Sequence, residues 1–210
     1  MDRGRVFGAV FGAAAADAVG ASFEGLMPND SRIPEMTGGG QFSLAAGEVT
    51  DDTLMMLVLL ETYADAGYYS RELFFSKMIQ TIRARPKTFG NTTRTLASLA
   101  EQGCSLTEAA KITDRLFGSR TNGSAMRTLP IGLTAVSAEA AAAEGRRVSA
   151  FTHIDSEAQD ACAAVSSAVY SLLHGASKEE VLSAVPEKYL NGELYPSVDA
   201  LEATRCAFCI

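Results

Sequence analysis

Helical periodicity is the feature that most restricts how this sequence can fold. Apolar residues recur three and four positions apart, as at Leu54, Leu57 and Val58, and this spacing places them on one face of a helix. No segment of more than a few residues alternates strictly between apolar and polar side chains, as a half-buried strand would. The pattern therefore predicts an all-α fold.

Capping and breaking residues predict where the helices begin and end. The predicted helices span about residues 3–19, 50–66, 71–84, 92–102, 107–117, 125–144, 155–174, 178–185 and 197–210. Pro130 is expected to begin a new segment or to kink the existing helix, Gly145 to end a helix, and Pro186 to follow the end of another. Residues 20–47, punctuated by Gly and Pro, are predicted to form a long loop.

Composition narrows the class of protein. A chain of 210 residues with 47% hydrophobic and 20% charged residues suits one folded domain, here residues 1–210, and argues against disorder. A net charge of −7 disfavours a nucleic-acid partner. The four cysteines lie in apolar surroundings and only two histidines are present, so reduced thiols are expected rather than a zinc site.

The N-terminal run of small residues shows no sign of targeting to a membrane. Asp17 interrupts it, and it is too short and too polar for a membrane span or a signal peptide. We therefore expect a cytoplasmic protein with no membrane partner.

A cluster of oxygen-bearing side chains lies where a loop enters the second predicted helix. Thr50, Asp51 and Asp52 stand in the stretch GEVTDDT, and hard cations such as Mg²⁺ prefer such ligands. The same residue types also cap a helix and complement its dipole. From the residues alone, both interpretations stay open.

The second cluster is a loop of small and polar residues before the sixth predicted helix. It consists of Gly118, Ser119, Arg120, Thr121, Asn122, Gly123 and Ser124. Exposed amides and hydroxyls in such a loop can hold a phosphate, although a plain connection between helices is the alternative. His153 precedes a long helix, where it either contacts a ligand or has a structural role.

Two acids bracket the end of the first predicted helix. Asp17 lies among alanines, so it is either an internal hydrogen-bond anchor or a residue on the solvent face. Glu24 begins the long loop and is free to swing toward a site.

In this order, the segments resemble the ADP-ribosylglycohydrolase family, which includes the dinitrogenase-reductase-activating glycohydrolases. The matching stretches are GAVFG and DAVG with Glu24, GG before GEVTDDT, TNGSAMR with Pro130, and Thr152-His153. They span nearly the whole chain. Ala16 stands where the family often has glycine, which is a small change.

The resemblance implies a compact, orthogonal helical domain with two Mg²⁺ ions that hydrolyses the bond joining ADP-ribose to a side chain or small acceptor. Thr50, Asp51 and Asp52 match the first group of metal ligands, and the two aspartates are also catalytic candidates. Glu24 matches a loop acid near the scissile bond. Residues 118–124 match the segment that binds the diphosphate and ribose, and His153 matches a ligand-contacting histidine.

One departure from the family pattern concerns the second group of metal ligands, an Asp-x-Asp motif, which occurs nowhere in this sequence. The last predicted helix also lacks a terminating Gly or Asn before Ile210. We therefore expect that the C-terminal helices of the family are missing, because the sequence is a cloned fragment, because the gene is split or frameshifted, or because a second polypeptide supplies them. A frayed natural C-terminus is the alternative explanation of the uncapped helix. The chain alone should hold at most one Mg²⁺ weakly and hydrolyse its substrate poorly. The alternatives are a catalytically inactive ADP-ribose-binding module and a structural helical protein.

Overall fold

The computed structural model describes residues 2–24 and 35–189, with side chains described up to residue 184. Its helices in chain order are α1 (Arg3–Gly20), α2 (Asp51–Ala66), α3 (Arg71–Ala84), α4 (Asn91–Glu101), α5 (Leu106–Phe117), the 3₁₀ turn η1 (Ala125–Arg127), α6 (Leu129–Thr134), α7 (Ala138–Ser149), α8 (Ser156–Leu173) and α9 (Lys178–Tyr189). Within these ranges the only β-type pairing is an isolated bridge between Gly39 and Leu44. The prediction of an all-α fold is confirmed.

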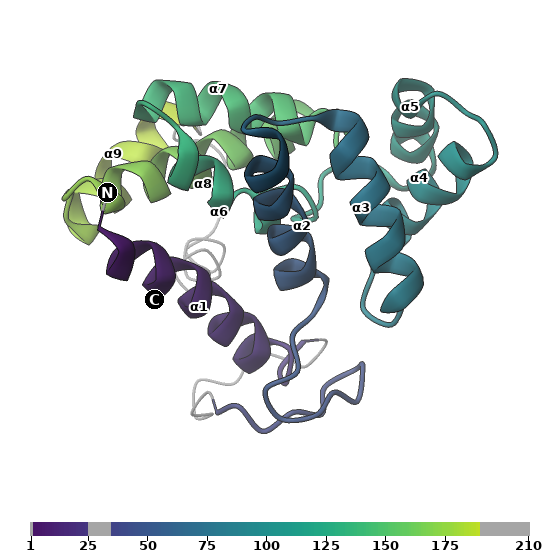
Figure 1. Cartoon of the computed structure of the whole chain (residues 1–210), viewed down its shortest axis with the longest axis horizontal. Coiled ribbons are helices and arrows are strands. Elements are labelled where there is room, and N and C mark those ends of the chain that lie inside the picture. Colours follow the sequence, from purple (N-terminus) through teal and green to yellow (C-terminus); the bar gives the residue numbers. More distant parts are fainter. Residues whose placement is uncertain (1, 25–34, 190–210) are drawn as a thin grey trace.

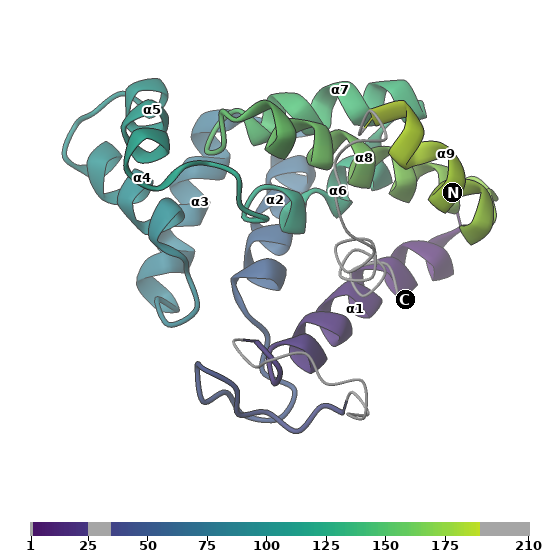
Figure 2. The same cartoon turned by 180° about the vertical axis from the view of Figure 1, so that it is seen from behind.

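Helix α2 runs through the middle of the molecule (Figures 1 and 2). It packs against α3 on one side and against η1 and α6 on the other. Helices α7 and α8 form a closely packed pair, α4 and α5 form a hairpin at one end, and α1 lies along the opposite edge (Figure 1). This arrangement places the N-terminus of α2 beside the C-terminal end of α1.

The core lies where α2 meets its neighbours. Met55 and Leu59 of α2 pack with Phe74 of α3, Leu96 of α4 and Phe151, which follows α7, and all are almost fully buried. Since aliphatic and aromatic burial is the main stabilising contribution in a domain of this size, this cluster fixes the direction of α2.

Local signals located most helix ends correctly. Thr50 and Ser70 accept hydrogen bonds from the first-turn amides of α2 and α3, and Gly67 ends α2 in the left-handed conformation with a φ of 76°. Gly can adopt this conformation without strain. Pro130 lies in the first turn of α6, as predicted.

The expectation that Gly145 ends a helix is wrong, because α7 continues to Ser149. A Cβ atom at Gly145 would lie 2.6 Å from the backbone oxygen of Cys162 in α8. Gly145 therefore serves the close crossing of α7 and α8, and sequence alone does not separate that role from a helix stop.

The expected end before Pro186 is also wrong, since α9 continues to Tyr189. A proline in the last turn removes one backbone hydrogen bond, and the helix continues through it. The predicted helix at residues 197–210 lies outside the described residues. No helix in the described part of the chain has both the length and the apolar character needed to cross a membrane.

Candidate functional site

Hydrogen bonding at the N-terminus of α2 orients the oxygen atoms of its capping and first-turn side chains. Thr50 is the N-cap, and its hydroxyl accepts a hydrogen bond from the amide of Asp52 at 3.2 Å. Asp51 and Asp52 form the first turn, where a helix dipole favours negative charge. The capping and metal-binding interpretations are therefore compatible, because the cap uses the Thr50 hydroxyl and leaves both carboxylates in place.

Asp17 is an internal anchor rather than a solvent-facing residue. One carboxylate oxygen accepts from the Thr50 hydroxyl at 2.7 Å, and the other accepts from the Thr50 amide at 2.9 Å and the Thr53 hydroxyl at 2.6 Å. Asp17 thereby ties α1 to the start of α2. Because the Thr50 proton points to Asp17 and one lone pair accepts from Asp52, the second lone pair of the hydroxyl oxygen stays available for a cation.

Burial raises the pKa of both carboxyls in the first turn of α2. The pKa of Asp51 rises from 3.8 to about 6, mainly through burial and partly through the charge of Glu24. The pKa of Asp52 rises from 3.8 to about 7 through burial and the charges of Asp17 and Asp51. A crowded group of partly buried carboxylates favours protons or a cation.

Glu24 lies close enough to act on this group by its charge. It follows α1, its side chain is exposed, and it contributes to the raised pKa of both Asp51 and Asp52. In the part of the chain that is described, no three or more His, Cys, Asp or Glu side chains are arranged to hold a metal ion together. The described donors thus amount to Thr50, Asp51 and Asp52, with Glu24 nearby.

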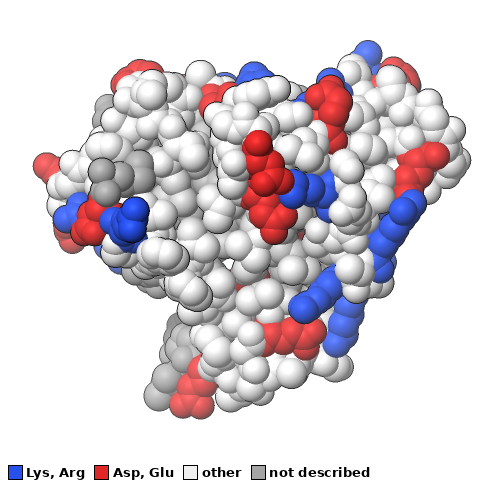
Figure 3. Space-filling view, viewed as in Figure 1, with Lys and Arg blue, Asp and Glu red and all other residues white. Residues whose placement is uncertain are grey.

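Basic side chains gather around the connection between α3 and α4. Lys and Arg gather along one edge of the molecule, over the end of α3 and the start of α4 (Figure 3). The exposed basic residues of this segment are Arg83, Arg85, Lys87 and Arg94. The same connection contains Gly90, whose backbone forms a hydrogen bond with the carboxylate of Asp51 and lowers its pKa.

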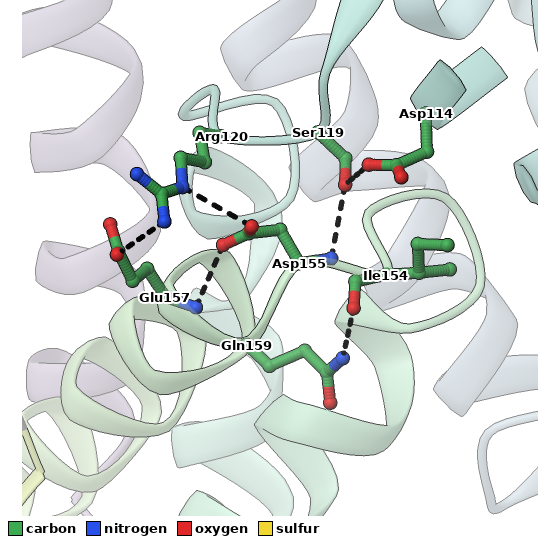
Figure 4. A network of polar contacts seen from close by, with 7 residues as sticks. All are labelled: Asp114, Ser119, Arg120, Ile154, Asp155, Glu157 and Gln159. Atoms are coloured by element: carbon green, nitrogen blue, oxygen red, sulfur yellow. Dashed lines mark hydrogen bonds and ion pairs between the residues drawn. The ribbon is translucent and has the colours of Figure 1, made fainter.

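The first half of the loop at residues 118–124 is fastened to the start of α8 (Figure 4). The Ser119 hydroxyl donates to Asp114 and accepts from the amide of Asp155 at 3.0 Å. The Arg120 guanidinium forms ion pairs with Asp155 at 3.2 Å and Glu157 at 2.7 Å. The Arg120 charge is therefore already balanced by two carboxylates in this structure.

The second half of the loop is partly accessible. Thr121 and Asn122 are exposed and Gly123 is partly so, whereas Ser124 is fully buried. Ser124 accepts a hydrogen bond from the Ser149 hydroxyl at 2.9 Å. Among the residues of the loop, the accessible donors that are not already paired with carboxylates thus lie at 121–123.

His153 lies directly beneath this loop and is fully buried. Its Nε2 atom is 2.9 Å from the Thr121 hydroxyl, and its Nδ1 atom is 2.7 Å from the Thr152 hydroxyl. Burial, followed by the charge of Arg127, lowers the pKa of His153 from 6.5 to about 3. A Cβ atom at Gly123 would lie 3.0 Å from His153 Nε2, so the loop packs tightly on a neutral imidazole.

The structure brings the predicted residues together in two groups. Thr50, Asp51 and Asp52 with Glu24 form one, and the 118–124 loop with His153 forms the other. They are connected because η1, which follows the loop, packs against both α2 and α8.

Arg127 has a role that the sequence did not reveal. Its side chain is fully buried and donates to the carbonyl of Gly123 at 3.1 Å and to the Thr152 hydroxyl at 2.7 Å. It also lies over the ring of Phe74. The sequence indicated this role only through the presence of a charged residue inside the motif TNGSAMR. The fold shows that the Arg127 side chain lies under the loop and supports it.

Comparison with known proteins agrees with this geometry. The sequence matches the family described as ADP-ribosylglycohydrolase over residues 2–207. It is 33% identical to ADP-ribosylarginine hydrolase Tri1 of Pseudomonas putida over 192 residues, which are 87% of this chain and 50% of that protein. The ADP-ribosyl-dinitrogen reductase glycohydrolase of Rhodospirillum rubrum is 33% identical over 61% of this chain and 44% of its own length.

A solved structure has the same fold. A chain of an ADP-ribosylglycohydrolase-related protein complex superposes with a TM-score of 0.72 at 29% identity, covering 91% of this chain and 63% of that one. The present chain spans about half the length of the curated relatives it matches.

Proposed function

Because the chain belongs to the ADP-ribosylglycohydrolase family, we propose that it forms part of a Mg²⁺-dependent site that hydrolyses the glycosidic bond between ADP-ribose and a protein side chain. Two named relatives are ADP-ribosylarginine hydrolases, from Pseudomonas putida and Serratia proteamaculans. We therefore propose arginine-linked ADP-ribose as the substrate.

The observation that carries this proposal is the anchored N-terminus of α2. Asp17 accepts the Thr50 hydroxyl proton, with the two oxygens 2.7 Å apart, so Thr50 can offer a lone pair beside the carboxylates of Asp51 and Asp52. Oxygen donors of this kind suit Mg²⁺. The ion, when bound, would help to hold the ribose hydroxyls and polarise a water molecule.

The fit to the metal is partial. Magnesium prefers about six oxygen ligands in an octahedron and keeps several waters, whereas Thr50, Asp51 and Asp52 supply about three. We therefore propose that this chain alone holds at most one weakly bound Mg²⁺ and hydrolyses substrate poorly. A second polypeptide that supplies further ligands would raise Mg²⁺ affinity and turnover together.

The protein's own groups account for the remaining roles. Glu24, exposed at the end of α1 and within electrostatic reach of Asp51 and Asp52, would act on the scissile bond or the attacking water as a general acid or base. The accessible donors at 121–123 would bind the diphosphate. The basic edge next to Gly90 would attract an anionic substrate.

The test combines binding with turnover. Calorimetric titration with Mg²⁺ should give weak binding to the unmodified chain and none to a variant with Asp51→Asn and Asp52→Asn. Asp65→Asn is a matched control, because Asp65 lies at the other end of α2 and its side chain is 58% exposed. Turnover of ADP-ribosylated arginine should be feeble in the unmodified chain and abolished in the double variant.

The outcomes separate the alternatives. ADP-ribose binding without any turnover, with or without the C-terminal part of a relative, would favour an inactive binding module. Failure to bind both Mg²⁺ and ADP-ribose would contradict the proposal. Robust turnover by the chain alone would contradict the need for further ligands.

A further inference from the structure

The 118–124 loop rests on a buried arginine whose charge has no carboxylate partner among the described residues. Arg127 is fully buried, and its Nε atom has no hydrogen-bond partner in that part of the chain. A guanidinium can only donate hydrogen bonds. Every hydrogen-bond partner of Arg127 must therefore be an acceptor. This determines which atom donates and which accepts in the hydrogen bonds described next.

The first contact orients the hydroxyl of Thr152. Arg127 Nη2 donates to Thr152 Oγ1 at 2.7 Å, and His153 Nδ1 lies 2.7 Å from the same oxygen. Thr152 is fully buried. If Nδ1 also donated to this oxygen, the Thr152 proton would be left buried without a partner, which is costly. The Thr152 hydroxyl therefore donates to His153 Nδ1.

The second contact orients the hydroxyl of Thr121. His153 is neutral, since burial and the charge of Arg127 lower its pKa to about 3. A neutral imidazole that accepts at Nδ1 carries its proton on Nε2. Nε2 therefore donates to Thr121 Oγ1 at 2.9 Å. Thr121 is exposed, so its own proton is free to point outward.

We propose that Arg127 is a positioning residue which, through Thr152 and His153, holds the Thr121 hydroxyl as a hydrogen-bond donor toward an anionic oxygen of the ligand. Under the proposed function, on which this identification of the ligand rests, that oxygen belongs to the diphosphate of ADP-ribose. The loop then favours acceptor groups at this point, because the Thr121 proton points outward and can be donated.

The direction of the chain of hydrogen bonds has a spectroscopic signature. The sequence contains only two histidines, so a His174→Gln variant assigns both in a long-range ¹H–¹⁵N spectrum. At about pH 7 His153 should be neutral with its proton on Nε2. In Thr152→Val the Nδ1 atom loses its donor, and the Nδ1–H form should appear.

Variants of Thr121, the exposed end of this chain of hydrogen bonds, test whether its hydroxyl contacts the ligand. Thr121→Val should weaken ADP-ribose binding by about 10-fold or more, as expected for a lost hydrogen bond to a charged group. Thr121→Ser, which keeps the hydroxyl, should restore it. Thr107→Val is the matched control, because Thr107 is also exposed and its hydroxyl accepts from Arg71. Circular dichroism should be unchanged in all three.

Each result tests one part of the inference. A His153 ring that is charged, or protonated on Nδ1, in the unmodified chain would overturn the inference. So would an unchanged ADP-ribose affinity in Thr121→Val. Failure of the unmodified chain to bind ADP-ribose, with the ring protonated on Nε2, would instead contradict the proposed function and the identity of the ligand.

Discussion

Asp52 is a residue whose protonation should affect stability strongly. Burial, with the charges of Asp17 and Asp51, raises its pKa from 3.8 to about 7. Between about pH 4 and about pH 7 the Asp52 side chain therefore binds more protons in the native state than in the unfolded state, and its contribution to the free energy of unfolding falls as the pH rises through this window. Replacing the carboxylate by a neutral group should remove the free-energy cost of holding this buried side chain in its charged form.

We expect Asp52→Asn to raise the free energy of unfolding by about 1–3 kcal/mol at about pH 8, where the carboxylate is charged, and to change it little at about pH 4. Urea denaturation at both pH values measures the effect. Asp65→Asn should change stability by less than about 0.5 kcal/mol at either pH. A loss of stability in Asp52→Asn at high pH would mean that the charged carboxylate is stabilised in the native state.

Asp17 is a second residue whose replacement should change the free energy of unfolding. Its carboxylate accepts from both the amides and the hydroxyls of Thr50 and Thr53. In Asp17→Asn an amide nitrogen would replace one oxygen and face either the Thr50 hydroxyl or the other three donors. We expect a loss of about 1–3 kcal/mol in the free energy of unfolding. Asp2→Asn, at the N-cap of the same helix, should be nearly neutral because Asn caps as well as Asp.

Mg²⁺ binding gives a second measurement on the same pair of variants. If Asp17 orients the Thr50 hydroxyl, then Asp17→Asn should weaken Mg²⁺ binding and Asp2→Asn should not. Equal Mg²⁺ affinity in the two variants would show that the anchor is structural only.

At the level of the helices, the crossing of α7 and α8 depends on Gly145. An added Cβ would meet backbone atoms of Cys162 at 2.6 and 2.9 Å, and backbone cannot rotate away as a side chain can. We expect Gly145→Ala to lower the free energy of unfolding by about 1–3 kcal/mol. Chemical denaturation measures this.

Gly8 is the matched position, because it also lies inside a helix but has no atom within 4 Å of an added Cβ. There the better helix propensity of alanine should raise the free energy of unfolding by about 0.5–1 kcal/mol. Equal gains at both positions would contradict the close approach of α7 and α8.

For the molecule as a whole, the most unusual feature is an exposed aromatic face on α1. Phe7 and Phe11 are 63% and 70% exposed and stack on each other with ring centroids 6.3 Å apart. Ala18 is the only buried residue of this helix. In the isolated chain these side chains contribute little burial, while they favour self-association.

We expect Phe7→Gln with Phe11→Gln to change the free energy of unfolding by less than about 1 kcal/mol and to reduce self-association in sedimentation measurements. Phe74→Ala is the contrasting control, since loss of the fully buried Phe74 ring should cost about 3–5 kcal/mol. A comparable loss in the double variant would mean that the exposed face is buried in solution.

The helical class, most helix ends and the candidate residues follow from the sequence alone. Thr50, Ser70 and Gly67 could be interpreted correctly because capping and the left-handed conformation depend on a few neighbouring residues. The motifs around Asp51 and Asn122 likewise indicate the family through their order along the chain.

Roles that depend on contacts between distant segments come from the packing of the helices. Asp17 is an anchor because Thr50 and Thr53 lie above it, 33 and 36 residues further along the chain. Gly145 is a crossing point because α8 approaches it, and Arg127 is a support because Thr152 lies within its reach. Local patterns cannot separate such roles, since the same residue types serve as caps, stops and surface charges, and only the packed fold supplies their partners.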